Sequence, residues 1–197
     1  MVSTGSALGS GRPTSRAWRT RDIVVTAVIA VAFGVVFWAW NLLYGAAEPL
    51  FAVALWARDI MYGVWLMPAI LAPLVVKKPG AALFAELLAA SVSAMLGNIW
   101  GVSVLLSGLV QGLGAELIFF LTGYRAYTIA VLVAAAIGSA IAAWLHDWYF
   151  YWAAIDPTIQ LLRGSVMVIS ATVFAAFGSL ALWRTLRQSG VLDGFPD

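Results

Sequence analysis

The chain has 197 residues, of which 63% are hydrophobic and 10% are charged, and its formal net charge is +2. Soluble domains carry about 25% charged residues, so this composition excludes an ordinary soluble domain and predicts an integral membrane protein. The absence of cysteine excludes disulfides, iron–sulfur clusters and thiol catalysis. The small positive charge does not indicate nucleic-acid binding, because the basic residues flank apolar segments, where they orient a membrane protein.

The first 21 residues are polar and contain arginine, and no small-residue cleavage site follows the first apolar run. We interpret residues 1–21 as a cytoplasmic tail rather than a cleaved signal peptide. Six apolar stretches follow, each long enough or nearly long enough to cross a bilayer. They cover residues 22–43, 60–76, 80–97, 104–123, 127–147 and 163–184. The sequence therefore predicts an all-α domain of six transmembrane helices over 22–187 and a cytoplasmic tail over 188–197.

Three connecting segments carry turn or loop signals. The sequence Lys77-Lys78-Pro79-Gly80 predicts a tight turn, because proline cannot continue the preceding helix and glycine relaxes the backbone. Residues 44–59 are apolar but carry charges and a proline, and they predict an external loop with a short interfacial helix. Residues 148–162 are rich in aromatic side chains and include Asp156-Pro157, which predicts another loop with a turn.

The basic residues predict the orientation. If the N-terminus is inside, nine of the eleven basic residues are cytoplasmic: Arg12, Arg16, Arg19, Arg21, Lys77, Lys78, Arg125, Arg184 and Arg187. Only Arg58 and Arg163 fall outside. The positive-inside rule therefore favours six spans with both termini in the cytoplasm, since five or seven spans would spoil the asymmetry.

Tryptophan gathers at the predicted outer boundary. Seven of the ten tryptophans lie there: Trp38, Trp40, Trp56, Trp100, Trp144, Trp148 and Trp152. An aromatic belt at the membrane interface explains most of them. The bias to one face also suggests that one or two line the mouth of an external pocket, because aromatic faces suit flat heterocycles and cations.

Two glutamates lie within apolar segments that contain no base. Between Pro79 and Tyr124 the only charged residues are Glu86 and Glu116. Placing an ionisable group in hydrocarbon costs about 2.5–3.5 kcal/mol on insertion scales, so such a group usually faces a cavity or a partner. Three explanations are open for the two glutamates: another helix supplies a cation, the carboxyl is protonated, or the partner is a ligand. The third alternative makes the glutamates a candidate site for a cationic or amino-bearing small molecule.

A few further polar or aromatic side chains within or beside the spans are candidate ligand contacts: Tyr62, Trp65, Asn98, Trp100, Gln111 and Asp147. Several have structural alternatives. Asn98 can end a helix, because asparagine tolerates the left-handed conformation there. Gln111 can hold two helices together by hydrogen bonding. Asp147 follows His146, and the two can form a solvated pair at a helix end.

No catalytic or nucleotide-binding constellation is visible. The sequence contains one histidine, which argues against histidine-based zinc sites, and it lacks the HExxH, GxSxG and Walker A patterns. We therefore expect no enzymatic activity, no ATP hydrolysis by this chain alone, and no metal or other cofactor.

Small residues form stripes in two spans. Ala27, Ala30 and Gly34 are spaced i, i+3, i+7 in the first span and predict a face on which another helix can dock. A similar stripe recurs in the fifth span, and one side of the fourth span carries glycines in place of larger side chains.

Several motifs carry a resemblance to a known family. They are Tyr62-Gly63-x-Trp65, Lys78-Pro79-Gly80-Ala81-Ala82-Leu83, Glu86, Leu96-Gly97-Asn98, Val110-Gln111-Gly112-Leu113-Gly114 with Glu116, Gly138-Ser139, Asp147 and Gly190-Val191-Leu192-x-Gly194. From about residue 20 to residue 194 the chain resembles the substrate-binding membrane subunits, or S components, of energy-coupling factor (ECF) vitamin transporters. It is most similar to their YkoE-like group, which is linked with thiamine and its precursor hydroxymethylpyrimidine.

The resemblance implies a six-helix S-component bundle in the bacterial plasma membrane, with a vitamin pocket open to the outside. It also implies a transmembrane coupling (T) subunit and two ATPase subunits as partners. The small-residue face of the first helix would dock on the T subunit, which here is Ala27, Ala30 and Gly34. Thiamine suits the residues, because a carboxylate can accept from its amino group or offset its thiazolium charge.

Two other functions remain open from the residues alone. One is a stand-alone proton- or cation-coupled carrier in which Glu86 and Glu116 relay protons. The other is a structural membrane subunit without a ligand.

Overall fold

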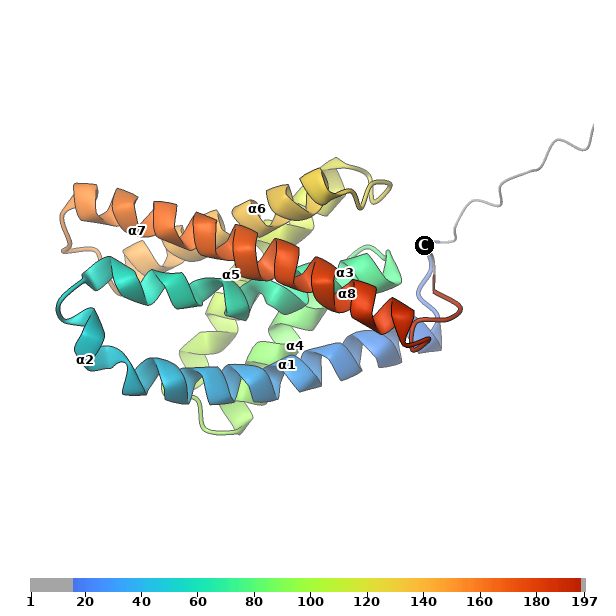
Figure 1. Ribbon diagram of the computed structural model, residues 1–197, viewed down its shortest axis with the longest axis horizontal. Coiled ribbons are helices and arrows are strands. Elements are labelled where there is room, and N and C mark those ends of the chain that lie inside the picture. Colours follow the sequence, from blue (N-terminus) through green and yellow to red (C-terminus); the bar gives the residue numbers. More distant parts are fainter. Residues whose placement is uncertain (1–15, 196–197) are drawn as a thin grey trace, which may run out of the picture.

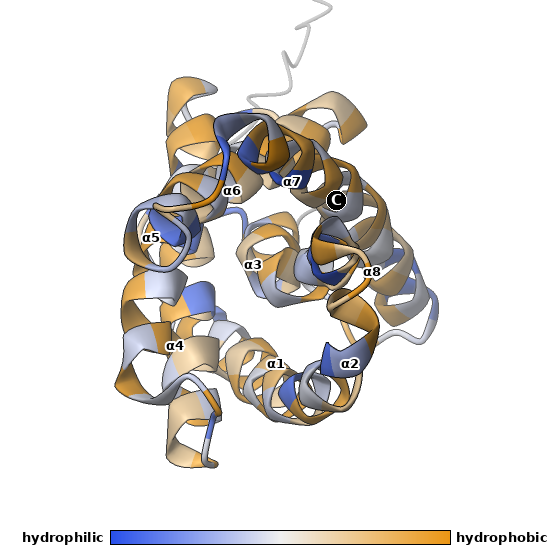
Figure 2. Ribbon diagram, turned by 90° about the vertical axis from the view of Figure 1, so that its left-hand side faces the viewer, coloured by the Kyte–Doolittle hydropathy of each residue, from blue (hydrophilic) through white to orange (hydrophobic). Residues whose placement is uncertain are grey.

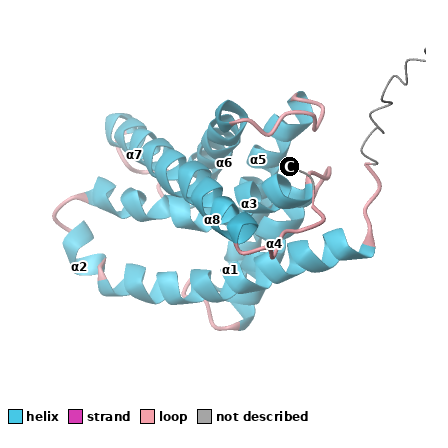
Figure 3. Cartoon of the chain, turned by 45° about the vertical axis from the view of Figure 1, so that its right-hand side comes forward, coloured by secondary structure: helices cyan, strands magenta, loops and turns pink. Residues whose placement is uncertain are grey.

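The computed structural model describes residues 16–195, which form helices and loops without a strand (Figures 1 and 3). The helices are α1 (Thr20–Ala46), α2 (Glu48–Phe51), η1 (Leu55–Leu66), α3 (Met67–Val76), α4 (Ala81–Met95), η2 (Gly101–Ser103), α5 (Val104–Leu121), α6 (Ile129–Phe150), α7 (Pro157–Ser170), η3 (Ala171–Gly178) and α8 (Ser179–Gln188). η1 and η2 are 3₁₀ helices and η3 is a π-helix. The structure does not describe residues 1–15, which include Arg12, or residues 196–197. Both ranges belong to the predicted tails.

The apolar helices follow the predicted order, and the all-α membrane class is confirmed. Within residues 16–195, five stretches have the length and apolar character needed to cross a membrane: Thr20–Ala46, Leu55–Val76, Gly101–Leu121, Ile129–Phe150 and Pro157–Gln188. The shorter α4 is also apolar.

The boundaries of the two expected loops differ from the prediction. Most of residues 44–59 are helical, because α1 extends to Ala46, α2 follows, and η1 begins at Leu55. The charge of Asp59 does not prevent a helix from forming there, because Arg163 pairs with this carboxylate inside the protein. The loop expected over 148–162 shrinks to 151–156, and Asp156 caps α7 by accepting from the Thr158 N–H.

α3 occupies the centre of the bundle. Every residue from Pro68 to Val76 is buried, and Figure 2, viewed from the α2 end, shows α3 enclosed by the other helices. α3 ends at the predicted turn, where Lys77 has a φ of 51° and Gly80 has a φ of 84°. The tight turn over 77–80 is therefore confirmed.

The small-residue stripe of α1 packs inside this chain. Ala30 is fully buried, and a Cβ added at Gly34 would lie 2.5 Å from the Cβ of Val92 on α4. The expectation that Ala27, Ala30 and Gly34 form a free docking face is therefore wrong for Ala30 and Gly34. Close approach of α1 to α4 requires these small residues, so they cannot also receive a partner helix. Ala27 is half-buried.

η1 approaches α7 so closely that only glycine fits at residue 63. A Cβ there would lie 2.3 Å from the Ser170 carbonyl oxygen. The Gly63 N–H donates to Ser170 Oγ at 2.9 Å, and this hydroxyl donates to the Ile60 carbonyl at 2.6 Å. The contact fixes the 3₁₀ helix that carries the neighbouring Tyr62 and Trp65 toward the interior.

Glu116 closes the N-terminus of α4. The residue before this helix is Gly80, which has no side chain to accept from the first N–H groups. Glu116 Oε1 accepts from the Gly80 N–H at 2.6 Å, and Oε2 accepts from the N–H groups of Ala82 at 3.0 Å and Leu83 at 3.3 Å. A carboxylate at this position also meets the positive end of the helix dipole.

We expect Glu116→Gln to lower the thermal stability of the purified protein. The substitution turns one acceptor into a donor opposite backbone N–H groups, and hydrogen bonds to charged groups contribute about 1.5–3 kcal/mol each. The unfolding midpoint should be measured in detergent against Glu48→Gln, which removes an exposed acid. Equal midpoints for the two variants would contradict the capping role.

Candidate functional site

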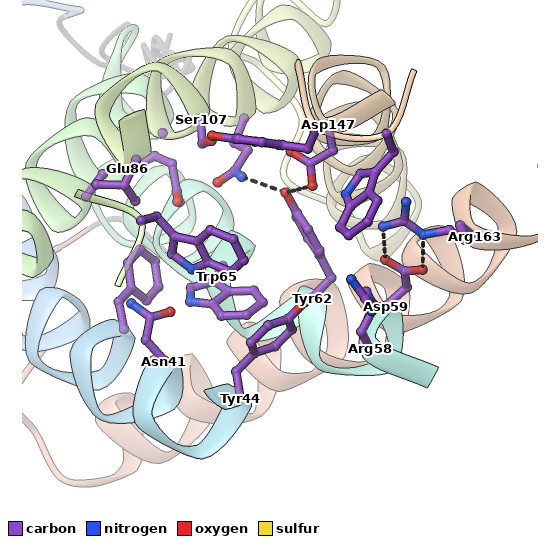
Figure 4. A pocket seen from close by; sticks show the side chains of 18 residues that line it. Asn41, Tyr44, Arg58, Asp59, Tyr62, Trp65, Glu86, Ser107, Asp147 and Arg163 are labelled. Atoms are coloured by element: carbon purple, nitrogen blue, oxygen red, sulfur yellow. Dashed lines mark hydrogen bonds and ion pairs between the residues drawn. The ribbon is translucent and has the colours of Figure 1, made fainter. Parts of the chain in front are cut away.

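A cavity of about 310 Å³ lies among η1 and helices α1, α4, α5, α6 and α7 (Figure 4). Cavities of about 300–1,000 Å³ are typical of sites for small organic ligands. Because its walls come from six elements, the cavity depends on the packing of the whole bundle.

Glu86 lies at one side of this cavity and is fully buried. Its Oε2 accepts from the Ala69 N–H at 3.1 Å, whereas its Oε1 is buried without a hydrogen-bond partner. No ion pair among residues 16–195 involves Glu86. An unsatisfied buried acceptor costs about 1–3 kcal/mol, so a ligand N–H at this oxygen would be stabilised.

Asn41 on α1 faces the same side of the cavity (Figure 4). Its side-chain amide is buried, and neither Nδ2 nor Oδ1 has a hydrogen-bond partner. The sequence analysis missed this residue, although an amide within the apolar first span was an available signal. Asn41 offers one donor group and one acceptor to a bound molecule.

A hydrogen-bonded chain crosses another wall of the cavity. Gln111 Nε2 donates to the Tyr62 hydroxyl at 3.2 Å, which donates to Asp147 Oδ2 at 3.0 Å. Asp147 Oδ1 lies 2.9 Å from His146 Nδ1. The structure therefore joins three predicted site residues, Tyr62, Gln111 and Asp147, and His146 holds the carboxylate in place rather than forming a solvated pair.

Aromatic rings form much of the remaining surface. Tyr44 lies at their centre, with its ring centroid 5.5 Å from that of Trp65 and 5.7 Å from that of Trp100. Tyr62 packs on Trp65 with centroids 5.5 Å apart. The predicted residues Tyr62, Trp65 and Trp100 thus line the cavity, and Tyr44 joins them without having been predicted.

Two arginines reach the cavity from the side away from Glu86 (Figure 4). Arg163 donates to both carboxylate oxygens of Asp59, at 2.9 and 3.1 Å, and both residues are buried. Arg58 and Arg163 also lie over the ring of Trp152, at 4.7 and 4.8 Å from its centroid. The sequence analysis used these arginines only for orientation, because it could not show that two distant segments meet.

Two predicted ligand contacts lie outside the cavity. Glu116 is occupied by the N-terminus of α4, and Asn98 donates to Ser93 Oγ at 2.8 Å and accepts from the Trp100 N–H at 2.8 Å. The expectation that Glu116 and Asn98 touch the ligand is therefore corrected. Both satisfy backbone or side-chain groups at helix ends, and Asn98 positions Trp100.

Four of the seven tryptophans of the predicted outer boundary have contacts that the structure defines. Trp100 and Trp152 line the cavity. Trp40 and Trp144 instead use their indole N–H groups to bond the carbonyls of Met61 and Gln160.

Comparisons with known proteins place the chain among transporters. The family model described as "ABC-type cobalt transport system, permease component" matches residues 21–142. The "Putative HMP/thiamine permease protein YkoE" of Bacillus subtilis (strain 168) is 35% identical over 184 residues, which cover 91% of this chain and 89% of that protein. A solved structure described as "Crystal structure of an S-component of ECF transporter" matches with a TM-score of 0.86 and 34% identity, over 90% of each chain.

These relatives are membrane transport components and not enzymes, and the apolar helices make this chain a multi-pass membrane protein of the same kind. The structural similarity extends over 90% of this chain. The resemblance found in the motifs is thereby confirmed, and the chain belongs to the S-component family of ECF transporters.

Proposed function

We propose that this protein captures thiamine or its aminopyrimidine precursor, hydroxymethylpyrimidine, from outside the cell for ATP-driven uptake. One observation carries the proposal: Glu86 Oε1 and both amide atoms of Asn41 are buried without partners beside a cavity with aromatic walls. Buried polar groups are almost always hydrogen-bonded, so these three atoms mark where a ligand supplies the missing partners.

An aminopyrimidine matches these groups. Its exocyclic amine can donate to Glu86 Oε1, and its ring nitrogens can accept from Asn41 Nδ2. The flat ring can pack against aromatic side chains that line the cavity, such as Trp65 and Tyr44, by offset or edge-to-face contact. In thiamine the thiazolium cation gains further from aromatic faces and from the carboxylate of Asp147. The printed name of the Bacillus subtilis relative supports this class of ligand.

The polar groups of the cavity are separated by aromatic rings, as in a site for an organic molecule. Among residues 16–195, no group of three or more His, Cys, Asp or Glu side chains is arranged to hold a metal ion. The aromatic walls therefore favour a heterocycle over the bare ion that the family model's description mentions.

The two alternative functions receive less support. A proton relay through Glu86 and Glu116 would need both carboxyls to be available, yet Glu116 accepts three backbone hydrogen bonds at α4. A purely structural subunit would not explain why polar atoms of Glu86 and Asn41 remain unpartnered beside a cavity.

Glu86→Gln should weaken the binding of thiamine and hydroxymethylpyrimidine by about tenfold to a hundredfold, because a charge-assisted hydrogen bond contributes about 1.5–3 kcal/mol. Asn41→Leu should also weaken binding, since it removes both amide groups. Isothermal titration calorimetry should compare these variants with the wild type and with Glu48→Gln, whose side chain is exposed. Affinities within threefold of the wild type for both cavity variants would refute the assignment.

Contacts between the basic segments support the proposed orientation. Lys78 Nζ donates to the Ala17 carbonyl, and Arg16 donates to the Gly123 carbonyl, both at 2.9 Å. The Arg21 guanidinium lies 4.8 Å from the ring centroid of Phe195. These contacts bring four segments to one end of the bundle. The other end carries α2 and the beginning of α7 (Figure 1). The positive-inside rule supports a cytoplasmic location for the basic end.

A reporter fused after Asp197 should therefore be active when it requires the cytoplasm and inactive when it requires the outside. Green fluorescent protein and alkaline phosphatase form a suitable pair. Strong phosphatase activity without fluorescence would contradict the proposed orientation. It would also contradict the proposal that the cavity receives the vitamin from outside.

The S-component relatives support a T subunit and two ATPase subunits as partners. In proteoliposomes we expect ATP-dependent thiamine accumulation only when these subunits accompany the chain. The chain alone should bind thiamine but not concentrate it, because it lacks the Walker A pattern needed to use ATP. Accumulation by the chain alone under a proton gradient would instead identify a stand-alone carrier.

A further inference from the structure

Arg58 is a half-buried cationic group that the proposed contacts with an aminopyrimidine leave unused. It lines the cavity, and its Nε is buried without a hydrogen-bond partner. Its guanidinium lies 4.7 Å from the ring centroid of Trp152 and 5.8 Å from that of Phe51. The two rings hold the planar group in position, while its N–H donors retain capacity for an acceptor.

The nearby charges do not neutralise Arg58. Asp59 is the adjacent acid, but Arg163 donates to both of its oxygens. Asp147 accepts from Tyr62 and lies beside His146. No ion pair among residues 16–195 includes Arg58. The guanidinium lines the cavity without an ion-pair partner among the described residues, so an anionic group on a ligand would form charge-assisted hydrogen bonds there.

The cavity also fixes where such an anion would lie relative to the rest of the ligand. In Figure 4, Glu86 and Asn41 lie on one side, Arg58, Asp59 and Arg163 lie on the opposite side, and Trp65, Tyr44 and Tyr62 lie between them. A molecule that places its aminopyrimidine against Glu86 therefore directs its other end toward Arg58. In thiamine the primary alcohol, at which the molecule forms a phosphate monoester, lies at the end away from the aminopyrimidine.

We propose that Arg58 is an anion subsite and that the protein prefers thiamine monophosphate to thiamine. This inference rests on the proposed function, because it needs the aminopyrimidine to lie at Glu86. A free alcohol accepts hydrogen bonds from Arg58 but leaves its charge uncompensated. A phosphate accepts two N–H donors in the fork geometry of guanidinium and supplies the missing negative charge.

The test compares two ligands by calorimetry: thiamine and thiamine monophosphate. The wild type should bind the monophosphate at least about tenfold more tightly than thiamine, as expected for added charge-assisted hydrogen bonds. Arg58→Gln should reduce that preference below about threefold, and Arg58→Lys should retain part of it because it keeps the charge without the fork. Arg125→Gln, which removes an exposed cation from the loop after α5, should leave the preference intact.

The results separate two kinds of failure. If the wild type binds thiamine as tightly as its monophosphate, and Glu86→Gln weakens both, then the proposed function stands and the anion subsite is refuted. An unchanged preference in Arg58→Gln also refutes the subsite. If neither ligand binds, or if Glu86→Gln has no effect on either of them, then the proposed function itself fails. If the Arg58 variants do not fold, equal binding of the two ligands by the wild type still refutes the subsite.

Discussion

The structure depends on how the central segment from Leu55 to Val76 satisfies its backbone polar groups away from water. A 3₁₀ helix joined to an α-helix leaves N–H and C=O groups unmatched, and hydrocarbon offers no replacement partner. Side chains from neighbouring helices supply the partners. The Ser170 hydroxyl accepts from the Gly63 N–H and donates to the Ile60 carbonyl. The Ser179 hydroxyl donates to the Met67 carbonyl, and the Glu86 carboxylate accepts from the Ala69 N–H. These contacts fix η1 and α3 within the bundle, and η1 in turn presents Tyr62 and Trp65 to the cavity.

The two glutamates of the apolar region show how one residue type acquires different roles. Both lack a basic partner in their own segments, and the sequence gives them similar surroundings. Glu116 meets three backbone N–H groups at the start of α4, so both of its oxygens are satisfied. Glu86 meets one N–H group and keeps an unpartnered oxygen. The two glutamates differ in the number of N–H donors that their carboxylates meet. Glu116 therefore has a structural role, whereas one oxygen of Glu86 is available to a ligand.

The same reasoning explains the polarity of the cavity. On one side, an acid and an amide retain unpartnered atoms; on the other, Arg163 is neutralised by Asp59 while Arg58 is not. Aromatic rings between the two sides favour a flat molecule. A ligand with an amino-bearing ring at one end and an anion at the other would satisfy both sides together. This complementarity supports capture of an intact vitamin derivative rather than of an isolated ion.

The sequence by itself determined the membrane class, the order of the apolar helices, the turn at Lys77–Gly80 and the candidates Tyr62, Trp65, Glu86, Trp100, Gln111 and Asp147. Hydrophobicity, turn chemistry and polar residues in apolar runs are local signals, so they can be read without coordinates. Only the tertiary structure decided that Ala30 and Gly34 pack on α4, that Glu116 and Asn98 serve helix ends, and that Asn41, Tyr44 and Arg58 reach the cavity. These roles depend on which groups from distant segments meet, and on whether each buried polar atom finds a partner there. Neither property is encoded in local composition or spacing, which is why Asp59 and Arg163, 104 residues apart, became a pair only in the folded protein.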